Sequence, residues 1–313
     1  MYIHGGKTDP SNSYGYSAAP TNNDLLRLSL SAPFSSSSPP WQTLVNSSIS
    51  PTQGPSLSWH TLSAYDTSHV LLFGGLPGPN SPTVLVDLAD SIYLLDLSQP
   101  MVPVWITEAD SWVNQPVRRI YHASVTDAAG RVYIIGGEMA DGSNRILSDH
   151  YLFQPTVPSF TVLPSENGPP DIVGHASVLL SDGRLLVFGG YSQSLGSFPS
   201  LSTIWVLNTS QSLPSWSLLQ ISSSSPLPAP RRSFAATSLS NGNVLIHGGT
   251  NTLQENFADG WILSTSQNVI QWKQIESLSQ LGARRDHFAI PAGDLVLFDF
   301  GMLLDSCLIR PYS

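Results

Sequence analysis

The chain has 313 residues, of which 11% are charged, and its 13 basic and 22 acidic residues give a net charge of −9 at pH 7. This balance argues against general nucleic-acid binding, which needs a basic surface, and the single cysteine, Cys307, excludes an internal disulfide framework and a cysteine-based zinc site. The 24 glycines, 25 prolines and 41% hydrophobic content favour many short strands joined by turns over long surface helices.

A short apolar run that ends in Gly-Gly recurs along the chain. Its five instances occupy residues 2–6, 71–75, 133–137, 186–190 and 245–249, so the first glycines are 53 to 69 residues apart. A sixth run at 296–298 continues as Asp299-Phe300-Gly301, so its doublet is broken. The recurrence indicates a repeat protein.

Each doublet belongs to a larger unit of four predicted strands, which we call a, b, c and d. Strand b ends at the doublet, and strand a precedes it at 60–63, 122–125, 175–178, 234–237 and 287–290. Turn sequences such as Asp182-Gly183 predict a hairpin between strands a and b. Aromatic residues mark strands c and d: Tyr93 and Trp105, Tyr151 and Phe160, Trp205 and Trp216, Trp261 and Trp272; in the first unit Leu26 and Trp41 hold these places.

This pattern of an apolar run, Gly-Gly, a Tyr or Trp and a later Trp resembles the kelch repeat. The resemblance implies an all-β kelch-type β-propeller of about six four-stranded blades in a single domain, with aromatic side chains filling the space between blades. The expected blade units are approximately 1–45, 58–107, 119–164, 173–220, 232–276 and 284–313.

The ends of the repeat leave the ring incomplete. The first unit begins at strand b and the last stops during or after strand c, which leaves roughly 22 strands where six four-stranded blades need 24. Three interpretations stay open: the segment 303–309 supplies the missing strand of the first blade, the chain is part of a larger ring, or the last stretch is a divergent end.

Arginines gather in one class of connection. Because strands alternate in direction, the d-to-a and b-to-c connections lie on one face of a blade. The d-to-a connections carry the predicted binding residues Arg118, Arg119, Arg231, Arg232, Arg284 and Arg285. The b-to-c loops carry Asp9, Asp24, Asp87, Asp90, Glu138, Asp141, Asp149, Glu255 and Asp259.

This arrangement predicts an arginine-lined centre with an acidic rim. Such a face would dock an acidic peptide or a carboxylated glycan, because the guanidinium fork accepts a carboxylate through two hydrogen bonds. In the alternative interpretation, each arginine bonds loop carbonyls and neighbouring acids and so holds the start of its blade.

Four histidines share one position in strand a: His60, His122, His175 and His287. We expect them to pack or hydrogen-bond beside the doublets, because inner strands of a propeller are usually too far apart to share a metal. His4 and His247 precede doublets and are expected in the core or between blades. We predict no metal and no cofactor.

Two enzymatic precedents in kelch proteins were compared with this chain. A galactose-oxidase-like copper site needs a tyrosine cross-linked to a cysteine, but Cys307 lies in the degenerate last unit and no ligand set carries over. The iron pattern of plant specifier proteins is Glu, three residues, Asp, three residues, His. Here Glu255 and Asp259 are followed by Leu263, so the pattern fails.

The predicted function is therefore a non-catalytic binding scaffold for a protein segment or carbohydrate. The alternatives are a galactose-oxidase-like or sugar-active enzyme with an unidentified site, and an intracellular kelch adaptor. The run 24–30, the Ser/Pro segment after it and Trp41 are similar to fungal galactose-oxidase-like kelch proteins. Asn46 and Asn208 lie in glycosylation sequons.

The sequence leaves the location of the protein open. No uncharged apolar run reaches the roughly 18 residues of a membrane-spanning helix, and residues 1–6 do not resemble a secretory signal. The resemblance favours an extracellular or cell-surface protein if a signal precedes this chain, and a cytoplasmic protein otherwise.

Overall fold

The computed structural model describes residues 1–8, 13, 18–32, 34–35, 38–45, 54–78, 91–107, 112–265, 269–299 and 307–309. The predicted residues Asp9, Asn46, Asp87 and Asp90 lie outside this part of the chain. The chain divides into two compact units, Met1–Phe34 with Pro40–Leu163 and Ser35–Pro39 with Pro164–Ser313. Each unit is described by itself.

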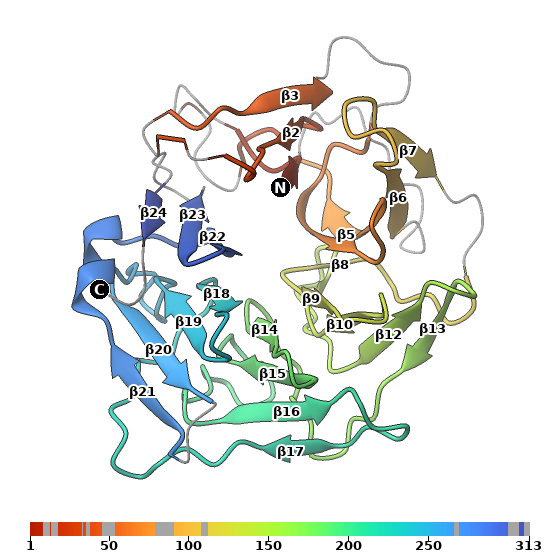
Figure 1. The fold of residues 1–313 in the computed structure, drawn as a ribbon. Helices are drawn as coiled ribbons and strands as arrows, with labels where there is room; N and C mark the ends of the chain where they lie inside the picture. Colours follow the sequence, from red (N-terminus) through yellow and green to blue (C-terminus); the bar gives the residue numbers. More distant parts are fainter. Residues whose placement is uncertain are drawn as a thin grey trace. The chain divides into compact units, whose positions relative to one another are not determined.

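The described strands of the first unit form three antiparallel sheets and one two-stranded ribbon (Figure 1). The first sheet has the order β1 (Tyr2–His4), β2 (Leu25–Arg27), β3 (Gln42–Val45). The second has the order β4 (Ser58–Ala64), β5 (His69–Leu76), β6 (Ile92–Asp96), β7 (Val104–Thr107). The third has the order β9 (Ala123–Thr126), β10 (Val132–Ile135), β12 (His150–Gln154), β13 (Ser159–Val162), and the ribbon pairs β8 (Arg119–Ile120) with β11 (Glu138–Met139).

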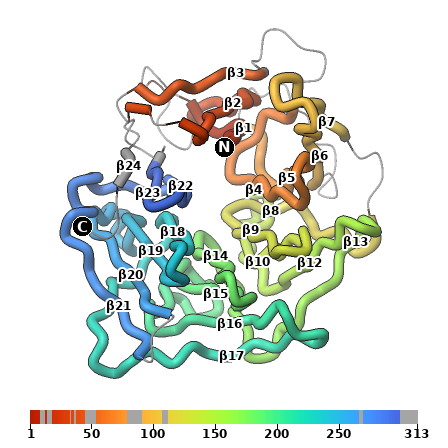
Figure 2. Tube along the Cα trace, in the orientation of Figure 1, coloured from red at the N-terminus to blue at the C-terminus, as the bar shows by residue number. Residues whose placement is uncertain are grey.

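The described strands of the second unit form three more antiparallel sheets, and strands β14 to β22 run from green to blue in Figure 2. One has the order β14 (Ala176–Leu179), β15 (Arg184–Phe188), β16 (Ile204–Asn208), β17 (Trp216–Leu218). The next has the order β18 (Ala235–Ser238), β19 (Val244–His247), β20 (Gly260–Ser264), β21 (Gln271–Gln274), and is followed by the 3-10 helix η1 (Glu276–Leu281). The last has the order β22 (Phe288–Ala292), β23 (Leu295–Asp299), β24 (Cys307–Ile309).

We call these six sheets blades 1 to 6 in chain order. Blades 2 to 5 contain strands a to d in sequence order, as predicted. Blade 1 holds strands b to d, and blade 6 holds strands a to c. Because β24 pairs with β23 as the third strand of its own blade, the interpretation in which 303–309 completes blade 1 is wrong for residues 307–309.

In each complete blade, no strand has a larger share of buried residues than strand b. Every residue of β10 and β19 is buried, and strand d exposes residues beside a buried aromatic. Runs such as Val132–Ile135 are apolar at consecutive positions, as expected for a strand covered on both faces. Within each unit, the core therefore lies between successive blades as well as within them.

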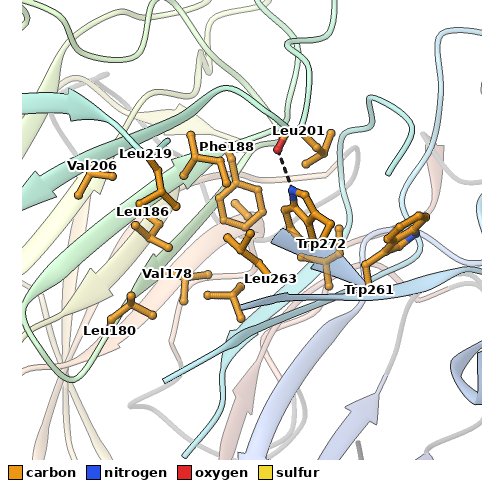
Figure 3. Close-up of a cluster of buried hydrophobic side chains, with 14 of the residues drawn as sticks. Val178, Leu180, Leu186, Phe188, Leu201, Val206, Leu219, Trp261, Leu263 and Trp272 are labelled. Atoms are coloured by element: carbon orange, nitrogen blue, oxygen red, sulfur yellow. Dashed lines mark hydrogen bonds between the residues drawn. The ribbon is translucent and has the colours of Figure 1, made fainter. Parts of the chain in front are cut away.

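Figure 3 shows this packing in the second unit. The Trp272 ring of β21 lies against Phe188 of the preceding blade, with ring centroids 6.0 Å apart, and its indole N–H donates to the Leu201 carbonyl at 2.9 Å. In the first unit, Trp105 packs on His4 in the same way, at 4.7 Å. The prediction that strand-d aromatics fill the space between blades is confirmed.

Three glycine doublets join neighbouring blades of the same unit. The second glycine donates its N–H to a carbonyl that precedes strand a of the next blade: Gly6 to Leu57 and Gly190 to Arg231 at 2.8 Å, and Gly249 to Arg284 at 2.9 Å. The first glycine has a positive φ, +68° at Gly248, and a Cβ there would stand 2.4 Å from the Arg284 carbonyl oxygen. Only glycine allows this close backbone approach.

Candidate functional site

The six predicted arginines fall into two groups by burial. Arg118, Arg119, Arg231 and Arg284 are buried, whereas Arg232 and Arg285 are half-buried. In the pairs 231–232 and 284–285, the first arginine points inward and the second reaches solvent. Of the rim acids within the described residues, Asp141 and Glu255 are exposed, and Asp24, Glu138, Asp149 and Asp259 are half-buried.

Arg119 is held by its own blade. Its guanidinium donates to Asp149 Oδ1 at 2.9 Å and Oδ2 at 3.4 Å, and to the carbonyls of Gly136 and Val117 at 3.0 and 3.2 Å. The Tyr151 hydroxyl donates to the same carboxylate at 3.0 Å. The Arg119 side chain is 0% exposed, so its charge is compensated inside the protein.

Arg231 repeats this geometry in the second unit. It donates to Asp259 Oδ1 at 2.6 Å and Oδ2 at 2.9 Å, and to the carbonyls of Gly248 and Ala229, each at 2.9 Å. The Trp261 indole N–H takes the place of the tyrosine hydroxyl, at 2.6 Å from Asp259 Oδ2. In two different blades, the arginine of the bidentate pair therefore also donates to the carbonyl of the first glycine in the doublet of its own blade.

The ion pair determines the pKa of each carboxyl group. Burial raises the pKa of Asp149, but the Arg119 charge and hydrogen bonds outweigh it, so this pKa lies below its ordinary value. Burial also raises the pKa of Asp259, and hydrogen bonds from Arg231 and Trp261 together with the Arg231 charge bring it below its ordinary value. Both aspartates are therefore ionised at neutral pH.

The other two complete blades lack both members of the pair. The residue that aligns with the arginine is Leu57 in blade 2 and Ile172 in blade 4, and both are buried. The residue that precedes strand c, where the aspartate stands, is Ser91 or Thr203. The two charges are present together or absent together, as expected if an unpaired buried charge is costly. The alternative interpretation, in which the arginines hold the blade, describes Arg119 and Arg231.

The half-buried arginines have different surroundings. The Arg232 guanidinium carbon lies 6.0 Å from the ring centroid of Phe198, which packs edge-on against Tyr191 at 5.6 Å. Arg285 Nε lies 3.6 Å from an Asp286 carboxylate oxygen, and the two side chains are 17% and 22% exposed. These groups come from d-to-a and b-to-c connections, the classes of loop that the topology places on one face of a blade.

A second feature lies directly before strand a. The residue before the aligned histidine or phenylalanine has a positive φ in five blades: 60° at Trp59, 53° at Tyr121, 64° at Gly174, 56° at Ser233 and 54° at Asp286. Sequence reasoning missed this position. A tryptophan and a tyrosine immediately before two aligned histidines were the available signal.

The two aromatic residues at this position contact each other in the first unit. The ring centroids of Trp59 and Tyr121 are 4.9 Å apart at an interplanar angle of 42°, and Lys7 Nζ lies 4.2 Å from the centre of the Trp59 ring. All three side chains are half-buried. We call these residues the Lys7–Trp59–Tyr121 row.

Two pairs of histidines lie between blades, as expected for His4 and His247. His4 Nδ1 is 3.2 Å from His60 Nε2, and His247 Nδ1 is 3.0 Å from His287 Nε2. The His247 Nε2–H donates to the Ala258 carbonyl at 3.1 Å, so Nδ1 accepts the hydrogen bond from His287. Burial lowers the pKa of His247 to about 4 and that of His287 to about 2.

Among the residues that the structure describes, no group of three or more His, Cys, Asp or Glu side chains is placed to hold a metal ion. Leu263, the third position of the failed iron pattern, is a fully buried strand residue. Nor does the described part of the chain contain a helix with the length and apolar character that a membrane crossing requires.

The repeated antiparallel sheets, five of which carry a Gly-Gly doublet after an apolar run, are typical of an all-β kelch-type propeller. Comparison with known families agrees. Residues 59–301 match the KLHDC2/KLHL20/DRC7 Kelch-repeats domain, and the chain belongs to this family. The expected fold class is thereby confirmed.

Several curated proteins are similar to the chain. It is 30% identical to rice Adagio-like protein 1 (Oryza sativa subsp. japonica) over 260 residues, which are 80% of this chain and 38% of the relative. It is 29% identical to the flagellar outer-arm dynein alpha chain of Chlamydomonas reinhardtii over 173 residues, 53% of this chain and 4% of the relative. It is 32% identical to human multiple epidermal growth factor-like domains protein 8 over 144 residues, 42% of this chain and 5% of the relative. The chain thus spans 38% of the length of its rice relative.

Proposed function

We propose that the chain is a non-catalytic kelch scaffold, acting as one domain, that holds a protein segment on the face of its d-to-a and b-to-c loops. The observation that carries this proposal is the division within the pair 231–232. Arg231 is fully buried and bound to its own blade, whereas Arg232 is half-buried beside an aromatic ring. Among the contacts described above, Arg232 makes no comparable bidentate pair with a carboxylate, and its guanidinium can donate to a carboxylate of a partner.

Arg232 and Arg285 are therefore the principal charged contacts of the proposed face, whereas their neighbours Arg231 and Arg284 are buried. A guanidinium beside an aromatic ring is typical of the centre of protein interfaces, where arginine and tyrosine are enriched. A carboxylated carbohydrate is the second candidate ligand, because the same fork binds its carboxylate. An enzymatic role, the galactose-oxidase-like relationship and glycosylation at Asn208 remain predictions from the sequence.

The test selects a random heptapeptide library, displayed on phage, against the whole chain. Peptides that bind are then measured against Arg232→Ala/Arg285→Ala and against Arg184→Ala. Arg184 is a matched control, because it is partly exposed, pairs with Asp182 and is the first residue of strand b, directly after the a-to-b turn.

The proposal expects the double variant to raise the dissociation constant about tenfold or more, the loss expected for a charge-assisted contact. The control variant should leave binding unchanged, and neither should shift the melting temperature by more than a few degrees. Peptides that bind the double variant as well as the unchanged chain would contradict the proposal.

A further inference from the structure

The Lys7–Trp59–Tyr121 row is built from three neighbouring blades of the first unit. Lys7 directly follows the doublet of blade 1, Trp59 is the second residue of strand a of blade 2, and Tyr121 precedes strand a of blade 3. The contacts of 4.2 Å and 4.9 Å place a cation and two aromatic rings in succession.

Stability does not explain why two large aromatic residues stand here. A positive φ is unfavourable for a bulky side chain and costs glycine nothing. The equivalent positions of the second unit carry Gly174, Ser233 and Asp286, which tolerate this conformation better. Trp59 and Tyr121 are half-buried and belong to none of the hydrophobic core clusters among the described residues.

Strained backbone and partly exposed aromatic rings concentrate at binding sites, where the surrounding structure holds them in place. The backbone here is held from both sides. Ser58, just before Trp59, lies in strand β4 opposite Leu76, and Ile120, just before Tyr121, pairs with Glu138. The rings are therefore presented at fixed positions.

The row also limits the chemistry of a ligand. The Lys7 ammonium disfavours a cationic ligand on Trp59 and favours an anion, and burial lowers the pKa of Lys7 from its ordinary value. The two rings offer an apolar surface next to that charge. Side chains two positions apart in an extended peptide point the same way and stand about 7 Å apart, within the reach of a row built from steps of 4.2 Å and 4.9 Å.

We propose that the Lys7–Trp59–Tyr121 row binds an extended peptide with an acidic side chain two positions from a large apolar side chain. The carboxylate pairs with Lys7, and the apolar side chain packs on Trp59 and Tyr121. This site deepens the proposed scaffold function, but it uses residues of the first unit and none of the arginines.

The test selects the heptapeptide phage library on the unchanged chain after depletion on Trp59→Ser/Tyr121→Ser. Serine is the natural residue at the equivalent position 233, where it has the same backbone conformation, so the variant should fold and its melting temperature is measured. The expected result is enrichment of peptides with Asp or Glu two positions from Leu, Ile, Phe or Trp. Trp59→Phe, which keeps a ring in place, should retain most of the binding.

One enriched peptide is then synthesised with Glu and with Gln at its acidic position. Both are titrated into the unchanged chain and into Lys7→Gln. The proposal expects the unchanged chain to prefer the Glu peptide about tenfold and Lys7→Gln to bind both peptides equally.

Three results would overturn the proposal: no enrichment of this pattern, equal binding to the serine variant, or an unchanged Glu preference in Lys7→Gln. Capture of a uronic acid oligosaccharide through Trp59, without any peptide, would also overturn it. Peptides whose binding depends on Arg232 and Arg285 but not on Trp59 would refute this site and leave the proposed function intact. Peptides whose binding depends on Trp59 but not on Arg232 and Arg285 would refute the arginine contacts.

Discussion

The Arg231–Asp259 pair offers a quantitative test of why the arginines recur. At the positions that align with Arg231 and Asp259, blade 4 has the neutral residues Ile172 and Thr203. The double variant Arg231→Ile/Asp259→Thr therefore gives blade 5 a pair of neutral residues that already occurs in the chain. The free energy of unfolding of both single variants and of the double variant is measured by urea denaturation, with fluorescence and circular dichroism as independent probes.

The structure gives different costs for the two single variants. Asp259→Thr leaves a 0% exposed guanidinium with only the carbonyls of Ala229 and Gly248 as acceptors, and breaking a buried pair in this way costs about 3–5 kcal/mol. Arg231→Ile leaves a carboxylate that is 24% exposed and still accepts the Trp261 N–H, so the expected cost is smaller, about 2–3 kcal/mol.

The double variant leaves no buried charge and should cost no more than about 2 kcal/mol. The two substitutions are therefore expected to be coupled by about 3 kcal/mol or more. If the losses of unfolding free energy in the two single variants add up in the double variant, then the cost of an unpaired buried charge does not explain why the two charges occur together.

Three further measurements follow from the blade seams. Because the unfolded chain binds protons at its histidines near pH 6.5 whereas folded His247 and His287 stay neutral down to about pH 4 and about pH 2, stability should fall as the pH drops below 6.5. At pH 5 the two residues together should cost about 4 kcal/mol, and the double substitution of both by phenylalanine should flatten the pH dependence by that amount; an unchanged slope would contradict this assignment. Gly248→Ala should cost about 3 kcal/mol or more in thermal unfolding, because its Cβ meets the Arg284 carbonyl. Gly142 has a φ of +79°, but a Cβ added there would have nothing within 4 Å, so Gly142→Ala should cost only about 1–2 kcal/mol. Equal losses of stability in the two variants would show that the backbone at Gly248 is not closely packed against Arg284.

Much of the fold could be predicted from the sequence, because its signals are local and repeated. A Gly-Gly doublet after an apolar run marks a backbone position that only glycine can occupy, and Gly248 shows why. The strand-d tryptophans Trp105 and Trp272 were predictable for the same reason, since they fill equivalent spaces between blades, against His4 and Phe188.

The candidate site was less predictable, because the roles of adjacent arginines depend on which way each side chain points. Arg231 and Arg232 are the same residue type in the same loop, yet only the first reaches Asp259. Blades 3 and 5 have both Arg and Asp, whereas blades 2 and 4 have neutral residues at both positions. These residues are visible in the sequence, but the strand register was needed to align the positions of different blades. The positive φ at Trp59 and Tyr121 could not be predicted from the residue type, since aromatic residues rarely adopt it. The available signal was the place of each ring immediately before an aligned histidine.

The most direct test of the whole account compares Arg231→Ala with Arg232→Ala, two neighbouring residues of one loop. Melting temperature and affinity for the selected peptides are measured for both. The account predicts that Arg231→Ala lowers the melting temperature by several degrees, whereas Arg232→Ala leaves it unchanged and weakens peptide binding. A stable Arg231→Ala, or an Arg232→Ala that binds as tightly as the unchanged chain, would contradict the division between an arginine that holds the blade and one that meets the ligand.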